Sequence, residues 1–146
     1  MLIRFVSILI FILSLSACQH TVDMAHLPLL NEPLTFQITD QDERNSMLIV
    51  EPYADGQWRF VQVDSLGAPI SRQILHQGKW RNDGFLPPNA KAQKLFTAVS
   101  VLISKQKNWP LAAGSEQIRI ENTAESGIYQ LYWHKQQWTI REITND

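Results

Sequence analysis

One change of hydrophobic period constrains the fold of this 146-residue chain more than any other feature. Residues 34–39 alternate apolar and polar side chains, which is typical of a half-buried strand. Residues 90–106 instead repeat apolar side chains three and four positions apart, and Asn89 offers an N-cap just before them. Alternation returns at residues 118–121. One helix, at about residues 90–106, is therefore predicted to interrupt a series of strands.

Six more segments are predicted as strands, because aromatic and β-branched residues gather there between turn residues. Asp55-Gly56 is the strongest hairpin signal in the chain, and it predicts that the strands on either side pair antiparallel. The six segments are residues 47–50, 58–63, 70–76, 79–81, 128–133 and 138–143.

Strands, one helix and then strands indicate an α+β fold. We expect a curved antiparallel sheet or an unclosed β-barrel, with the one main helix packed against its open side. A closed β-sandwich is the alternative. Residues 33–146 have the length of a single domain that buries one moderate core.

The first 17 residues have the pattern of a signal peptide: Arg4 gives a positive charge, and residues 5–13 are apolar apart from one serine. The sequence Leu15-Ser16-Ala17-Cys18 that follows resembles the lipobox of bacterial lipoproteins. We therefore expect cleavage before Cys18 and covalent lipid on that cysteine. An ordinary secretory signal followed by a chance cysteine is the alternative.

Lipid on Cys18 is the expected membrane anchor, because the apolar run is shorter than the roughly 20 residues of a transmembrane helix. Cys18 is also the only cysteine, so no intramolecular disulfide can form. Gln19, rather than aspartate, follows the cysteine, which leaves delivery to the outer membrane open. The expected location is the periplasmic face of the outer membrane. Residues 18–32 are predicted to be the lipidated cysteine and a polar, proline-containing tether.

Large aromatic residues are numerous for a domain of this size. Composition alone favours a solid core, because protein interiors pack densely. The other hypothesis is a cavity between sheet and helix that receives an apolar ligand such as an acyl chain. The predicted lining of that cavity is Phe36, Trp58, Phe60, Trp80, Phe96, Val99 and Trp133.

Leu66 stands in a predicted turn between Ser65 and Gly67, where an apolar residue either folds inward or inserts into an apolar surface such as a bilayer. Other functional classes find little support. The net charge of −1 disfavours a nucleic-acid partner. The four histidines have no metal-ligand spacing, the serines have no nucleophile-elbow context, and no cofactor motif is present. We therefore predict no metal, no catalytic residue and no enzyme.

The run of residues 58–70, then Pro87-Pro88 and Leu95-Phe96, resembles a family of small proteobacterial lipoproteins of unknown function, encoded beside aryl-polyene and fatty-acid-like biosynthesis genes. More distantly, the strand, Leu66-Gly67 turn and strand are similar to LolB, the outer-membrane lipoprotein receptor. Ser65 stands where that receptor usually has proline. The second resemblance implies a LolA/LolB-like unclosed barrel with an apolar cavity, and a membrane-contacting Leu66.

The resemblance raises the cavity hypothesis above the solid core. The leading hypothesis is a membrane-anchored, non-enzymatic lipoprotein that binds an apolar or acyl ligand and assists its delivery to the outer membrane. The ligand would be a lipid, the acyl chains of a lipoprotein or an aryl-polyene lipid, and a periplasmic carrier or exporter protein is the expected protein partner. The alternative is an accessory or scaffold subunit, with a filled core, of an envelope biosynthesis or export complex.

Overall fold

The computed structural model describes residues 21–144, and the predicted signal peptide and Cys18 lie outside these residues. One α-helix, α2 (Ala90–Gln106), and two short 3-10 helices, η2 (Ala54–Gly56) and η3 (Ser115–Gln117), accompany eight strands in the described part. The strands are β1 (Leu34–Asp40), β2 (Asn45–Tyr53), β3 (Gln57–Asp64), β4 (Pro69–His76), β5 (Lys79–Asn82), β6 (Arg119–Asn122), β7 (Ile128–Trp133) and β8 (Gln136–Ile143).

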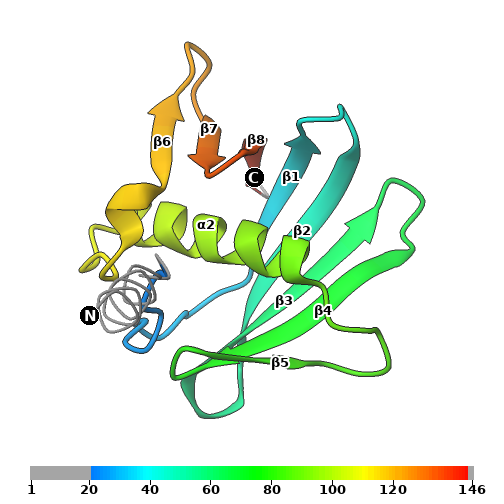
Figure 1. Ribbon diagram of the computed structural model, residues 1–146, viewed down its shortest axis with the longest axis vertical. Helices are drawn as coiled ribbons and strands as arrows, with labels where there is room; N and C mark the ends of the chain where they lie inside the picture. Colours follow the sequence, from blue (N-terminus) through cyan, green and yellow to red (C-terminus); the bar gives the residue numbers. More distant parts are fainter. Residues whose placement is uncertain (1–20, 145–146) are drawn as a thin grey trace, which may run out of the picture.

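All eight strands form a single antiparallel sheet in the order β5-β4-β3-β2-β1-β8-β7-β6. The outer strands β5 and β6 do not pair with each other, so the sheet is not closed into a barrel. The chain between them contains α2, which crosses the open, concave side of the sheet (Figure 1). The predicted α+β class, the curved antiparallel sheet and the single main helix are confirmed, and the sandwich alternative is wrong.

Strand β1 joins the two halves of the sheet. The N-terminal meander β1 to β5 and the C-terminal hairpins β6 to β8 meet there, because β1 pairs with β2 on one side and with β8 on the other. Phe36 and Ile38 of β1 point to the concave side and are fully buried, whereas Gln37 between them is exposed. The period of two predicted for this strand therefore separates core from solvent.

Helix α2 begins where the sequence predicts, because the Asn89 side chain accepts a hydrogen bond from the backbone N–H of Ala92 at 3.0 Å. Every residue from 95 to 104 is buried, which is more than one amphipathic face. The polar residues Ser100 and Ser104 are among them. Their hydroxyls make hydrogen bonds within the helix: Ser100 donates to the Phe96 carbonyl oxygen at 2.8 Å, and Ser104 donates to the Ser100 carbonyl oxygen at 3.0 Å.

Aromatic rings from the sheet and the helix pack directly on one another in the core. Phe60 of β3 stacks on Phe96 of α2, with ring centroids 5.1 Å apart and planes at 18°. Trp80 of β5 meets Phe60 edge-on, also at 5.1 Å between centroids. Trp58 lies 6.1 Å from Trp109, which follows the helix. These contacts bind β5, β3 and the helix together although the sheet itself ends at β5.

Residues 21–32 differ from the free tether that the sequence suggests, because they pack against the core. Met24 and Leu30 are buried, and Val22 and Leu27 lie against the same cluster. The indole N–H of Trp58 donates to the carbonyl oxygen of Pro28 at 2.9 Å. This N-terminal segment therefore covers the end of the core near the last turn of α2 (Figure 1).

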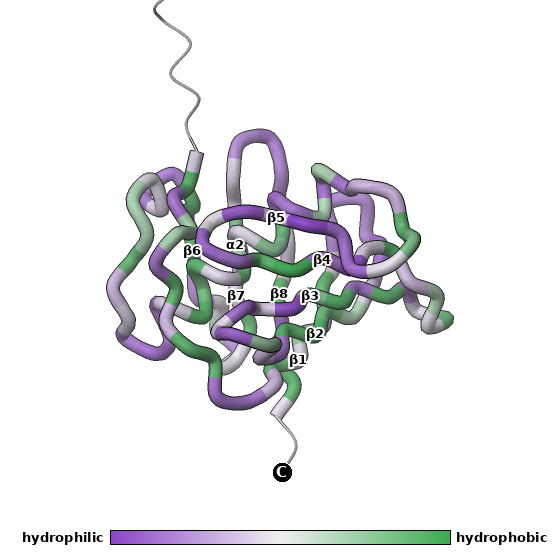
Figure 2. The backbone as a smooth tube through the Cα atoms, turned by 90° about the horizontal axis from the view of Figure 1, so that it is seen from below, coloured by the Kyte–Doolittle hydropathy of each residue, from purple (hydrophilic) through white to green (hydrophobic). Residues whose placement is uncertain are grey.

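Strand β5, at one edge of the sheet, is short and mostly polar, as Figure 2 shows. Lys79 and Arg81 are exposed there, and charged residues on an edge strand discourage pairing with other chains. The aromatic contacts of Trp80 thus hold an edge strand whose two charged side chains face water.

The aromatic stack predicts a large difference between two phenylalanines. Phe60 has no exposed surface and Phe85 is fully exposed (107%) in the loop before α2. Phe60→Ala is expected to lower the free energy of unfolding by about 3 to 5 kcal/mol, measured by urea denaturation, because it removes the ring on which Phe96 and Trp80 rest. Phe85→Ala, the matched control, should change it by no more than about 0.5 kcal/mol. Similar losses in both variants would contradict this account of the core.

Candidate functional site

A pocket of about 540 Å³ lies between the first turns of α2 and the concave face of the sheet, and we call it the mouth pocket. Its size is within the usual range for small-molecule sites. A mostly apolar floor and a mostly polar rim make up its wall. The floor is formed by Ile38, Ala92, Leu95 and Trp138 with the buried, hydrogen-bonded pair Ser46 and Gln62, and the rim by Asp40, Arg44, Asn45, Asp64, Ser65, Ile70, Asn89 and Lys91.

Several strand ends converge on this pocket. The β1–β2 turn and the β3–β4 turn both lie there, because alternate turns of an antiparallel meander are at the same end of the sheet. A register shift between Gln62 and Val63 leaves Ile70 of β4 without a partner on β3, and such a bulge bends the strand at this point. Charged residues of the turns therefore lie next to apolar residues of the core in the wall of this pocket.

The floor of the mouth pocket is shallow, because the aromatic core begins directly beneath it. One step inward on the same face of each strand stand Phe36 on β1, Leu48 on β2 and Phe60 on β3, and all three have no exposed surface. Small and polar residues, Ser46 and Ala92 among them, occupy the level of the pocket itself. The space therefore accepts a compact apolar group rather than a long, fully enclosed hydrocarbon chain.

Charged groups on the rim are paired unequally. The Arg44 side chain donates to Asp40 from Nε at 3.0 Å and to Asp42 from Nη2 at 2.7 Å. Lys91 Nζ lies 3.8 Å from Asp40 Oδ2, beyond hydrogen-bond distance. Asp64 accepts hydrogen bonds from the backbone N–H groups of Leu66 and Ala68, both at 2.9 Å. Lys91 is thus the rim charge that is least engaged and best able to meet an anionic group.

The pKa of Asp40 lies below its ordinary value. Burial by itself raises the pKa of this carboxyl. Hydrogen bonds from the Arg44 side chain and from the backbone N–H groups of Arg44 and Asp42, together with the charge of Arg44, outweigh burial and lower the pKa. Asp40 therefore stays ionised at neutral pH and holds the cations of the rim close to the pocket.

The structure brings most of the residues predicted to line a cavity together, but they pack against one another in the core. Phe36, Trp58, Phe60, Phe96 and Val99 are buried in one core cluster, and Trp80 packs against that cluster. Trp133 belongs to the same cluster and stacks on His134 at its edge. None of these seven residues lines the mouth pocket. Trp58 lines a smaller pocket of about 190 Å³ beneath the N-terminal segment.

The tucked-in interpretation of Leu66 is wrong, since 92% of this residue is exposed. The two hydrogen bonds to Asp64 fix the β3–β4 turn, and the backbone N–H of Gly67 donates to the Asp64 carbonyl oxygen at 3.0 Å. Ser65 and Ile70, on either side of the turn, line the mouth pocket. Leu66 therefore stands on the rim as a rigid apolar tip.

No family model, curated protein or solved structure matches this chain. The resemblances to LolB and to the lipoproteins of aryl-polyene clusters therefore stay predictions. Among residues 21–144, no helix is long and apolar enough to cross a bilayer, and no group of three or more metal-ligating side chains gathers in the same part of the chain.

The mouth pocket is the site that sequence reasoning missed. Asp40 stands where β1 enters a charged turn and Lys91 lies on the exposed side of the helix, and neither local pattern by itself indicates a pocket. The juxtaposition of the two depends on where α2 crosses the sheet. One signal in the sequence could have indicated the pocket: alternate turns of an antiparallel meander lie at the same end of the sheet, and the turns after β1 and β3 both carry charged residues.

The lowered pKa of Asp40 predicts how stability responds to acid. A carboxyl whose pKa is lower in the folded state contributes stability above its unfolded pKa, and that contribution is lost as the pH falls through the folded value. Stability should therefore fall as the pH drops from about 5 to about 3, with a shallower fall in Asp40→Asn. Urea denaturation at several pH values measures how steeply the free energy of unfolding falls with pH in each protein. An equally steep fall in the two proteins would show that Asp40 does not cause the loss of stability in acid.

Proposed function

We propose that this protein is a membrane-anchored, non-enzymatic binding protein for a compact amphipathic, lipid-like molecule. It holds this molecule in the mouth pocket and helps to place it in the outer membrane. The observation that carries the proposal is the division of the pocket into an apolar floor and a charged rim. Lipid on Cys18 supplies the anchor, as the lipobox pattern predicts.

The proposed ligand has two parts. Its apolar part rests on Ile38, Leu95 and Trp138, where each 100 Å² or so of buried apolar surface contributes about 2.5 kcal/mol. Its anionic part lies beside Lys91 and Arg44. The filled aromatic core excludes a long enclosed chain, so a lipid, a lipoprotein acyl chain or an aryl-polyene lipid would enter only by one end. Release follows from competition with another apolar environment, such as that of a periplasmic partner protein.

Charge reversal at the rim tests this proposal with a simple probe. 8-Anilinonaphthalene-1-sulfonate combines apolar rings with an anion, and the rise in its fluorescence on entering an apolar site reports its binding. Lys91→Glu is expected to weaken binding on the order of tenfold at low salt, because the rim gains a repulsive charge in place of an attractive one. The measurement is a fluorescence titration of the purified domain.

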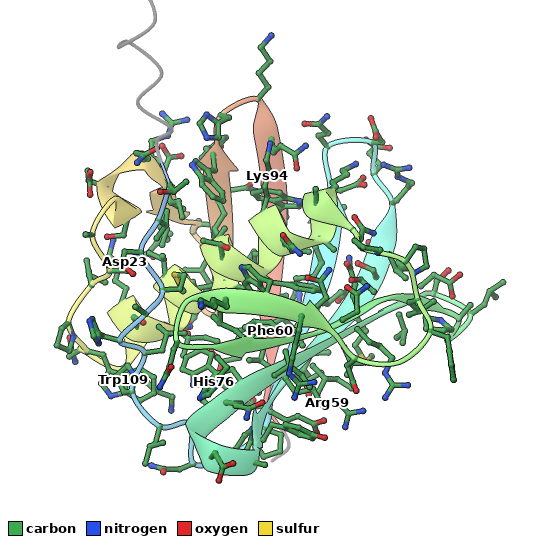
Figure 3. All side chains as sticks on the ribbon, turned by 60° about the horizontal axis from the view of Figure 1, so that its bottom comes forward. Asp23, Arg59, Phe60, His76, Lys94 and Trp109 are labelled. Carbon is green, nitrogen blue, oxygen red and sulfur yellow. The ribbon has the colours of Figure 1, made fainter. Side chains whose placement is uncertain are left out.

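Lys94→Glu is the matched control, because Lys94 is an exposed lysine one turn along the same helix and does not line the pocket (Figure 3). It should bind the probe as the original protein does. Equal weakening in the two variants, or an original protein that does not bind the probe, would count against the pocket. Native mass spectrometry of protein purified from the cell envelope should then identify the bound molecule.

A second candidate function is an accessory or scaffold subunit of an envelope biosynthesis or export complex. The filled core and two fully exposed apolar side chains, Leu66 and Phe85, favour it. The β3–β4 turn and the β5–α2 loop that carry them lie on the same side of the molecule (Figure 1). Photocrosslinking in cells from position 85 distinguishes the two: one dominant protein partner together with an empty pocket supports the subunit.

Leu66→Glu separates folding from function. The leucine makes no buried contact, so we expect the midpoint of thermal unfolding to stay within about 1 °C and the protein to remain correctly localised. The ability of the variant to restore the phenotype of a strain lacking the chain should be lost, because the apolar tip at the rim meets the surface that donates or accepts the ligand. Leu29→Glu, at an exposed leucine outside the mouth pocket, is the control and should retain function. Full function in Leu66→Glu would remove the tip from the mechanism.

A further inference from the structure

The N-terminal segment is held where it enters the domain. The backbone N–H of Asp23 donates to the carbonyl oxygen of Ala113 at 2.8 Å. Gly114, at φ +84°, lets the segment pass closely, since a Cβ there would lie 2.5 Å from the Thr21 carbonyl oxygen. Thr21 is therefore fixed against the loop that follows α2.

Few residues separate this fixed point from the expected lipid. Cys18 is three positions before Thr21, and three extended residues span at most about 11 Å. A lipid chain on Cys18 starts in the bilayer, so Thr21 lies no more than about that distance from the lipid headgroups. The surface around Thr21 must then face the membrane.

That surface is the loop of residues 107–114, which we call the exit loop. Its sequence after Asn108 is Trp109-Pro110-Leu111-Ala112-Ala113-Gly114, without a charge. Leu111 is 55% exposed. The loop is also rigid: the backbone N–H of Trp109 donates to the Ser104 carbonyl oxygen at 2.8 Å, and the Trp109 ring packs near Trp58. An exposed leucine on a fixed loop can enter a bilayer without a large loss of conformational entropy.

Positive charge lies beside this apolar loop. Lys105 is exposed near the end of α2, and Lys107 Nζ lies 5.8 Å from the centre of the Trp109 ring. Glu32 accompanies Lys107 at 3.7 Å, and its own side chain is mostly exposed. Lysine and tryptophan beside an inserted apolar residue are typical of protein surfaces at the headgroup level of a membrane. Figure 3 shows Asp23 and Trp109 on the same side of the molecule.

We propose that the exit loop is the membrane-facing surface of the domain, with Leu111 inserted between lipids and Lys105 and Lys107 beside anionic headgroups. This inference rests on the proposed lipidation of Cys18. It also fixes the direction of the mouth pocket, which lies at the opposite end of α2. The pocket reaches along the helix to Leu95, and the remaining turns place about 18 Å between it and the exit loop. The mouth and its Leu66 tip therefore lie away from the bilayer that holds the anchor.

Two labelled leucines test the orientation. The lipidated full-length protein is reconstituted in vesicles of phosphatidylethanolamine and phosphatidylglycerol, with either Leu111→Cys or Leu66→Cys carrying a nitrobenzoxadiazole label. Cys18 does not compete for the label, because its sulfur is blocked by lipid. We expect the label at position 111 to shift its emission to the blue and to be quenched by spin-labelled lipid. The label at position 66, which is even more exposed in the domain alone, should do neither.

The outcomes distinguish the inference from the proposal on which it rests. Flotation of the vesicles and the mass of the N-terminal peptide report whether Cys18 carries lipid. A lipidated protein that floats but whose label at position 111 is not quenched overturns the exit-loop surface and leaves the anchor intact. Quenching at position 66 in place of 111 overturns the orientation. A protein without lipid that stays in solution overturns the anchor, and the inference with it.

Discussion

The fold depends on one constraint: an open sheet must cover a helix in which every residue from 95 to 104 is buried. Strands β5 and β6 leave the sheet unpaired at its two edges, and α2 closes the concave side between them. The stack of Phe60 on Phe96 fixes the helix at the centre of that surface. The rings touch one another, and the larger of the two pockets lies where the strands end in small and polar residues.

The crossing from β5 to α2 is secured on the outer face of the sheet as well. Arg59 donates to Asp83 from Nε at 2.7 Å and to Glu51 from Nη1 at 3.0 Å, and Arg72 reaches the same Asp83 oxygen at 3.1 Å. Burial alone raises the pKa of Asp83, but the hydrogen bonds and charges of Arg59 and Arg72 lower it below its ordinary value. The chain is therefore held on both faces before it turns into the helix, which leaves the mouth pocket with a firm wall.

Local signals predicted the elements well, and long-range contacts decided what the sequence could not show. The period of two, the Asp55-Gly56 turn and the Asn89 cap each lie within a few residues, so they could be recognised without a partner. The pairing of β1 with β8 joins residues about a hundred positions apart, and no local pattern specifies it. The same holds for the segment at residues 21–32, whose scattered apolar residues have no clear period although Met24 and Leu30 are buried. The aromatic residues show the opposite difficulty: their number indicated burial, but a filled core and a lined cavity have the same composition.

Helix α2 separates two surfaces that serve different purposes. Its first turn contributes Asn89, Lys91 and Ala92 to the mouth pocket, and its last turn leads into the loop that fixes the N-terminal segment. The helix between them is buried in close-packed rings. Energetic coupling between the mouth and the exit loop would require a second packing of similar energy, so we expect binding and attachment to be independent. A domain built in this way works by position: the anchor sets its distance from the membrane, and the rigid helix sets where the pocket opens.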